Sequence, residues 1–132
     1  MQVREAEDLA GVARLFAQMY SVPVEQAHSR LAAMQAGKWN VTEGLGDQGA
    51  VAFALWVDLD EYVFLRSYAV DAERRVGGLG RVFFERLRAE IFPQGKTIRL
   101  EVFSDGPHDF WAKMGFKQVT TGMWLEPVEN AA

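Results

Sequence analysis

The sequence predicts an α/β fold in which a mixed, mostly antiparallel central sheet carries helices on both faces. Three observations lead to this prediction. Two helical patterns stand near the N-terminus, three apolar strand patterns follow one another in the middle, and strands alternate with helices in the second half. The expected order is β-α-α-β-β-β-α-β-α-β(-β), and 132 residues with 49% hydrophobic composition suit one domain, residues 1–132.

The first part of the chain predicts a short strand, QVRE, followed by two helices. Asp8 can cap the first helix, in which apolar residues recur at helical spacing. This helix should end near Ser21, because Pro23 disfavours helical geometry in the residue before it. The second helix is expected from Pro23 to Gln35, with Gly37 at its C-terminal end.

The middle of the chain predicts an antiparallel meander of three strands. The strand patterns are KWNVTE (38–43), AVAFALWV (50–57) and YVFLRSYAV (62–70). GLGDQG (44–49) is expected to be a loop and DLDE (58–61) a turn. The second strand is almost wholly apolar, which is typical of a strand covered on both faces.

The second half alternates helices and strands. A glycine-rich stretch leads into a helix over residues 79–91, whose apolar side chains recur about every four residues. A strand is expected at 97–103 and a short helix at 106–114, with Pro107 in its first turn. Residues 115–126 supply one or two closing strands.

Composition argues against several classes of function. The chain has no cysteine, which excludes disulfides and thiolate metal sites and fits a cytoplasmic protein. His28 and His108 are far apart in the sequence, so no metal site is expected. No apolar run approaches the roughly 20 residues that a membrane helix needs, and MQVREAED is too charged for a signal peptide. A net charge of −4 argues against nucleic acid and for a cationic partner.

The stretch RRVGGLGR (74–81) predicts an anion site. It follows a strand and opens a helix, where free backbone N–H groups and the helix dipole favour phosphate, and glycines allow close approach. A simple turn with solvated arginines is the alternative. The stretch lacks the Lys-Ser/Thr pair of a Walker P-loop, and it follows an antiparallel meander rather than a dinucleotide-binding strand–helix unit.

Two segments together resemble the motifs of the GNAT superfamily, the acyl-CoA-dependent N-acyltransferases. VDAERRVGGLG resembles the V-x-P-x-x-R-G-x-G-x-G signature, with Val70, Arg75, Gly78 and Gly80 on signature positions. LEVFSDGPHDFWAKMGF resembles the second motif of that family, a strand, an Asn, a short helix and a closing Gly-Phe. The resemblance is strongest over 65–116 and implies a GNAT-type sheet.

The resemblance implies acetyl-CoA as the cosubstrate and no metal. Backbone N–H groups from Val76 to Arg81 would hold its pyrophosphate, and the strand edge near Tyr68 would pair with the pantetheine arm. The cofactor-binding positions that it implies are Tyr68, Ala69, Val70, Arg75, Val76, Gly77, Gly78, Leu79, Gly80, Arg81, Ser104 and Trp111.

The sequence departs from the family pattern at four of these motif positions. Ala72 replaces the usual proline, Val76 a glycine and Ser104 the asparagine. Trp111 replaces a tyrosine whose phenol would protonate the departing CoA thiolate, and an indole N–H is no useful acid. That role would fall to Tyr68 or to water, while Trp111 would pack against pantetheine or the core.

Carboxylates are the candidate general bases for the acceptor amine. Alternation along the predicted strand 97–103 places Glu101 on one face with Arg99, so it lies either beside the thioester or in a pair with Arg99. The acids of the 58–61 turn are either solvated or placed to attract a cationic acceptor. Trp39 and Trp56 either line the acceptor pocket or belong to the core.

The function expected from this resemblance is acetyl transfer to a primary amine by direct attack, without a covalent enzyme intermediate. The acceptor would be a small molecule or a peptide, the protein a monomer or homodimer, and no nucleic acid or membrane is expected as a partner. The alternative is a non-catalytic acyl-CoA-binding or regulatory domain. A generic nucleotide-phosphate binder is a third possibility, which predicts ATP binding without regard to the pantetheine arm.

Overall fold

The fold follows the predicted order of strands and helices. A computed structural model describes the chain except for residues 75–76, 103–105, 121–122 and 126–132. The elements are β1 (Gln2–Glu5), α1 (Ala10–Tyr20), α2 (Val24–Ala36), β2 (Asn40–Gly46), β3 (Gly49–Asp58), β4 (Tyr62–Val70), a 3₁₀ turn (Ala72–Arg74), α3 (Leu79–Arg86), a π-helical turn (Leu87–Ile91), β5 (Thr97–Glu101), α4 (His108–Lys113), β6 (Lys117–Thr120) and β7 (Met123–Leu125).

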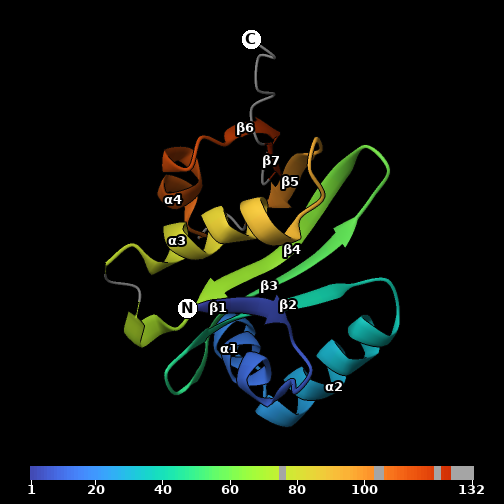
Figure 1. Ribbon diagram of the computed structural model, residues 1–132, viewed down its shortest axis with the longest axis vertical. Helices are drawn as coiled ribbons and strands as arrows, with labels where there is room; N and C mark the ends of the chain where they lie inside the picture. The colour runs from blue at the N-terminus through green and yellow to red at the C-terminus, as the bar shows by residue number, and fades with distance from the viewer. Residues whose placement is uncertain (75–76, 103–105, 121–122, 126–132) are drawn as a thin grey trace.

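The strands form one mixed sheet in the order β1-β2-β3-β4-β5-β7-β6 (Figure 1). Strands β4 and β5 pair in parallel, and the other described pairs are antiparallel. The parallel pair is connected through α3, as a parallel connection requires a crossover. The predicted mixed, mostly antiparallel sheet is therefore confirmed.

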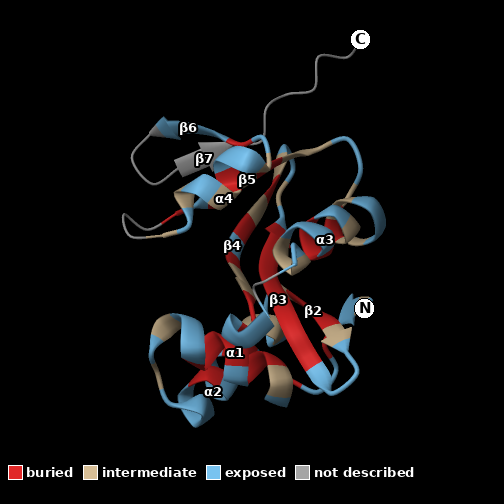
Figure 2. Ribbon diagram, turned by 90° about the vertical axis from the view of Figure 1, so that its left-hand side faces the viewer, coloured by how far each residue is buried: buried red, intermediate tan, exposed pale blue. Residues whose placement is uncertain are grey.

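Helices cover both faces of the sheet, each over its own apolar core (Figure 2). On one side, α1 and α2 pack over buried residues that include Phe53 and Leu55 of β3. On the other side, α3 and α4 pack over a cluster that includes Leu65 of β4 and Leu100 of β5. We call these sides the α1–α2 face and the α3–α4 face.

Most helix bounds agree with the sequence prediction. The α1 helix ends at Tyr20, and Ser21 follows in a left-handed conformation with φ of 54°. Asp8 accepts a hydrogen bond from the backbone N–H of Ala10, so it supports the first turn as expected. The helix predicted over 79–91 is α-helical only to Arg86 and then continues as the π-helical turn.

The predicted loop at 44–49 is wrong, because β2 continues to Gly46 and β3 already begins at Gly49. Backbone pairing with β3 outweighs the weak strand preference of glycine there. Gly44 also has a packing role, since a Cβ atom on it would lie 3.0 Å from the Phe83 ring. The glycines of this segment therefore reflect close packing and a tight hairpin.

Strand β4 changes phase in its middle. Its partner residues in β3 run from Leu55 opposite Ser67 to Trp56 opposite Leu65, which leaves Arg66 as one extra residue. This is a β-bulge, which locally twists and bends the strand that carries it. As a result, Leu65 and Tyr68 both belong to the core of the α3–α4 face, although they are three residues apart.

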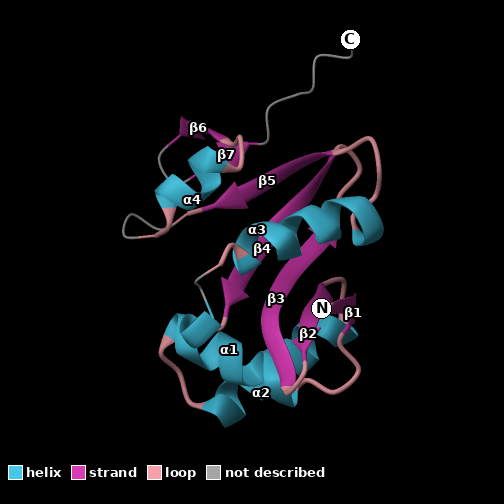
Figure 3. Ribbon diagram, turned by 60° about the vertical axis from the view of Figure 1, so that its left-hand side comes forward, coloured by secondary structure: helices cyan, strands magenta, loops and turns pink. Residues whose placement is uncertain are grey.

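The bulge lies where β4 and β5 separate. Their pairing ends with Leu65 opposite Leu100, whereas β4 continues to Val70. Figure 3 shows the two strands side by side near the β3–β4 hairpin and apart at their C-terminal ends. A gap therefore opens beside residues 66–69 of β4.

Candidate functional site: a cavity at the divergence of β4 and β5

The N-terminus of α3 is opened by glycines in left-handed conformations. Gly77 and Gly78 have φ of 90° and 78°, which side-chain-bearing residues rarely adopt. Gly78 is the N-cap, and no described side chain caps the helix. The first intrahelical bond runs from the Val82 N–H to the Gly78 carbonyl, so the N–H groups before Val82 have no partner within the helix.

Close packing, rather than backbone conformation, requires glycine at position 80. A Cβ atom at this position would lie 3.1 Å from Cε1 of Phe110 and 3.6 Å from Cγ2 of Val70. Added to Gly78, by contrast, a Cβ would meet nothing within 4 Å. Gly80 therefore lets α3 approach α4 and β4 closely, while Gly78 leaves open space in front of the helix.

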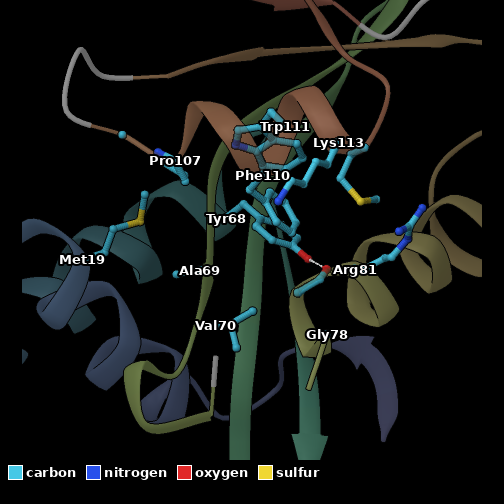
Figure 4. A pocket seen from close by; sticks show the side chains of 13 residues that line it. Met19, Tyr68, Ala69, Val70, Gly78, Arg81, Pro107, Phe110, Trp111 and Lys113 are labelled. Atoms are coloured by element: carbon cyan, nitrogen blue, oxygen red, sulfur yellow. Dashed lines mark hydrogen bonds between the residues drawn. The ribbon is translucent and has the colours of Figure 1, made fainter. Parts of the chain in front are cut away.

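A cavity of about 650 Å³ lies between the end of β4, the start of α3 and α4 (Figure 4). Seven predicted site residues line it: Tyr68, Ala69, Val70, Gly78, Gly80, Arg81 and Trp111. The structure thus brings together both motifs that the sequence singled out. Of the other predicted cofactor residues, Gly77 and Leu79 lie in the same loop and helix start but not in the lining.

Other lining residues were not predicted. They are Met19, Gly106, Pro107, Phe110, Lys113 and Met114. All but Met19 belong to the second motif segment, so that motif was the signal that could have found them. Met19 reaches the cavity from the end of α1, and nothing in the local sequence marks it (Figure 4).

Trp111 forms a buried wall of the cavity. Its side chain is 4% exposed. Its ring lies 5.2 Å from that of Tyr68 and 5.4 Å from that of Phe84, both in edge-on contacts. Such contacts stabilise an aromatic cluster beyond the burial of apolar area. The packing role predicted for Trp111 therefore fits its surroundings.

Tyr68 is placed in the same cluster, with its hydroxyl donating to the carbonyl oxygen of Gly80 (Figure 4). Burial raises the pKa of this hydroxyl, although a hydrogen bond with the backbone of Phe84 partly opposes the shift. A phenol with a raised pKa is a weaker acid. The acid role suggested for Tyr68 remains a prediction, and these surroundings do not favour it.

Glu101 stands at the end of β5, outside the cavity lining. Its neighbours Leu100 and Val102 are buried in the core of the α3–α4 face, so alternation directs Glu101 to the opposite face. It is exposed and makes no ion pair with the described residues, Arg99 included. Glu101 therefore borders the gap from the α1–α2 face, and its role as base remains a prediction.

The acids of the β3–β4 turn lie away from the cavity. Tyr62 begins β4 beside this turn, and Tyr68 is six residues further on, or about 20 Å along the strand. Asp58 forms an ion pair of 2.5 Å with Lys96. None of these acids is among the residues that line the cavity. Trp56 is 7% exposed and belongs to the core.

Asp71 anchors the segment that leads from β4 to the glycines. Its carboxylate accepts hydrogen bonds from the backbone N–H of Glu73 and from Arg14 of α1. The Glu73 N–H in particular, with the nearby arginines, lowers the pKa of Asp71. The predicted site residues Arg75, Val76 and Ser104 lie outside the described residues.

Two properties of the described part of the chain bear on other classes of function. None of its helices combines the length and apolarity that crossing a membrane requires. Likewise, its histidine and carboxylate side chains form no group of three or more that could hold a metal ion.

This arrangement, a strand pair that diverges beside a glycine-opened helix, is the fold of the GNAT acetyltransferases. An aminoglycoside 6′-N-acetyltransferase in complex with coenzyme A has a TM-score of 0.73 at 14% identity, over 95% of each chain. PaiA N-acetyltransferase from Thermoplasma acidophilum, also with coenzyme A, has a TM-score of 0.71 at 16% identity, over 94% of this chain and 95% of that one.

The ribosomal-protein-S18-alanine N-acetyltransferase from Escherichia coli has the same fold. Its TM-score is 0.69 at 20% identity, over 94% of this chain and 88% of that one. Neither a protein-family model nor a curated protein matches the sequence. The likeness therefore establishes the fold, and the activity has to be argued from the site.

Proposed function

We propose that this protein transfers an acetyl group from acetyl-CoA to a primary amine by direct attack. The observation that carries the proposal is the gap between β4 and β5, which adjoins a cavity leading to the open N-terminus of α3. A thioester held in this gap would be reachable by an amine from the α1–α2 face. Two of the proteins with this fold were solved with coenzyme A.

The cavity residues fit the chemical groups of coenzyme A. Backbone N–H groups of α3 and the open space at Gly78 suit the pyrophosphate, which the helix dipole also favours. Arg81 and Lys113 line the cavity and add positive charge. The edge of β4 beyond the bulge suits the amide-bearing pantetheine arm, which would add to the sheet as an extra strand does.

The proposed reaction needs little acid–base help at the leaving group. The amine nitrogen attacks the thioester carbonyl, a C–N bond forms, and the C–S bond breaks to release the CoA thiolate. A thiol with a pKa near 8.5 leaves readily as its anion. The proton lost by the amine would pass to Glu101 directly or through water.

A non-catalytic acyl-CoA-binding protein is the second candidate. It is favoured by one specific feature of the described cavity wall: Trp111 stands at the position of the expected tyrosine, and the hydroxyl of Tyr68 is engaged with the carbonyl of Gly80. Both candidates require binding of coenzyme A, and they differ only in turnover.

The deciding experiment follows thiol release from acetyl-CoA with a panel of amines, with mass spectrometry of the products and calorimetry of CoA binding. Transfer requires an acetylated amine in amounts equal to the thiol released. Micromolar CoA binding without any acetylated product would instead support the non-catalytic candidate. Absence of CoA binding would contradict both, and ATP binding of equal strength would favour the nucleotide-phosphate alternative.

A further inference from the structure

Three cationic side chains gather on the α1–α2 face, beside the gap. The guanidinium carbon of Arg66 lies 5.3 Å from the centre of the Trp39 ring, and Nζ of Lys38 lies 5.9 Å from it. The guanidinium carbon of Arg99 lies 4.0 Å from the centre of the Tyr62 ring. We call Lys38, Arg66 and Arg99, with these two rings, the cationic patch.

The charge of this patch is not balanced by the described residues. None of Lys38, Arg66 and Arg99 forms an ion pair with them, whereas five other cationic side chains do. The Nε–H group of Arg99 is buried and has no hydrogen-bond partner in the described structure. A buried donor without an acceptor is unfavourable. A local excess of positive charge is also unexpected in a chain of net charge −4.

The patch adjoins the gap in which the thioester would lie. Arg66 is the bulged residue of β4, two positions or about 7 Å before the cavity-lining Tyr68. Arg99 is in register with Phe64 on the neighbouring strand, and Glu101 follows it by the same spacing of about 7 Å. Arg66 of β4 and Glu101 of β5 therefore each follow the last paired residues, Leu65 and Leu100, and Arg99 lies one residue before Leu100.

We propose that the acceptor is a primary amine that also carries an oxyanion, a carboxylate or a phosphate, which the cationic patch binds. This proposal rests on the acetyl transfer proposed above. Guanidinium groups bind carboxylate and phosphate through paired hydrogen bonds, and side chains already stacked on rings lose less freedom when they do so. Binding at Arg66 and Arg99 directs the ammonium end of the acceptor toward Glu101 and the gap.

The proposal replaces the expectation of a cationic acceptor. That expectation relied on the net charge of −4 and on the acids of the β3–β4 turn, which lie at the far end of β4 from the cavity. A polyamine would instead meet three positive charges on its way to the gap. Long-range repulsion of this kind lowers the rate of encounter and weakens as salt is added.

The test compares two acceptors that differ only in one charge. 6-Aminohexanoate and 6-aminohexanamide carry the same distant amine, and one has a carboxylate where the other has a neutral amide. We expect kcat/KM to be at least about tenfold higher for the carboxylate, the minimum for one charge-assisted hydrogen bond. O-phosphoethanolamine against ethanolamine tests phosphate in the same way, so the larger ratio identifies the oxyanion.

Two variants connect this preference to the patch. Arg66→Gln should reduce the larger ratio to about twofold or less, and Arg66→Lys should retain part of it. The exposed Arg30 of α2 provides the matched control, because Arg30→Gln removes the same charge away from the gap. Equal rates for both members of both pairs, or an unchanged ratio in Arg66→Gln, would overturn the proposal.

A binding measurement separates this proposal from acetyl transfer itself. Titration of 6-aminohexanoate and O-phosphoethanolamine into the protein by NMR, without acetyl-CoA, should show saturable binding that Arg66→Gln weakens at least about tenfold. If CoA binds but no amine is acetylated, transfer fails while this binding still tests the patch. If neither anion binds and transfer proceeds with neutral amines, the patch proposal alone is wrong.

Discussion

The two sides of β4 differ in how they are built and in how far the sequence reveals them. On the α3–α4 face, Trp111 is buried and Tyr68 is partly buried, and the residues that line the cavity include Gly78 and Gly80 at the start of α3. On the α1–α2 face, Arg66 and Glu101 are exposed side chains from different strands. A backbone site leaves a glycine motif in the sequence, whereas a site made of separate side chains does not.

The difference suggests that the two sides of β4 have different roles in binding. A cosubstrate that is always the same molecule can be bound by a fixed backbone frame, which tolerates little change. An acceptor that varies between proteins of one fold is better met by side chains that are replaced without cost to the core. Substitutions on the two sides should therefore affect different properties of the protein, and the following predictions test that contrast.

The largest effect is expected from Trp111→Ala, on stability. Loss of this buried ring should lower the free energy of unfolding by about 3–5 kcal/mol, measured by urea denaturation. Trp111→Phe should lower it much less and change kcat by less than about tenfold. A thousandfold loss of kcat in a folded Trp111→Phe protein would contradict the packing role and indicate a direct catalytic role for the indole.

The next effect concerns coenzyme A affinity. Gly78→Val should weaken CoA binding by about 100-fold or more, because the side chain obstructs two backbone hydrogen bonds to charged oxygens, each worth about 1.5–3 kcal/mol. Gly95→Val is the control, since Gly95 has a similar φ of 84°, also with nothing within 4 Å of an added Cβ. Equal CoA affinity in the two variants, measured by calorimetry, would show that the glycine loop does not bind the pyrophosphate.

A smaller effect is expected on the acceptor side. Glu101→Gln should lower the rate by about tenfold near neutral pH, less than the usual hundredfold of base catalysis, because water can replace an exposed base. The loss should shrink as pH rises, since more of the amine is then already deprotonated. Glu7→Gln, also exposed, serves as the control. A pH–rate profile of Glu101→Gln that matches the wild type would remove Glu101 from the mechanism.

The smallest effect is expected where the two sides are joined, at the Arg14–Asp71 pair. Asp71→Asn should lower stability by up to about 1 kcal/mol at neutral pH, because Arg14 is partly exposed. The pKa of Asp71 is lowered by folding, so this contribution is present above about pH 3.9 and is lost as pH falls further. Unfolding of both proteins at pH 7 and pH 3 should show the difference vanish, and a constant difference would contradict the charge-based explanation.

The order of strands and helices and the residues of the cavity were largely predictable from the sequence. Hydrophobic periodicity marks most elements, and the glycine stretch with the second motif identifies Gly78, Arg81 and Trp111 together. What the sequence did not reveal depends on tertiary placement. The bulge at Arg66 has no local signal, because the 62–70 stretch reads as one regular strand, and the cationic patch joins residues from three separate segments.

The loop error at 44–49 and the alternatives left open for the acids of the β3–β4 turn have different causes. At 44–49, local glycine preference was outweighed by pairing between strands, which is a non-local effect. For the turn acids, the sequence left open whether they are solvated or attract an acceptor, because it does not show which end of β4 the cavity adjoins. Only the divergence of β5 after Leu65 shows that the cavity lies at the other end.

The single extra residue at Arg66 also constrains how many residues β4 can contain between Leu65 and Val70. While the bulge is present, the stretch between Leu65 and Val70 must contain an even number of residues for both side chains to face α3 and α4, and without the bulge the number must be odd. Deletion of Arg66 would remove the bulge and restore regular alternation, so Tyr68 and Val70 would keep their direction, whereas deletion of one further residue would turn both toward α1. Segment exchanges among proteins of this fold should therefore carry over the bulge and the parity of this stretch together before they match its sequence.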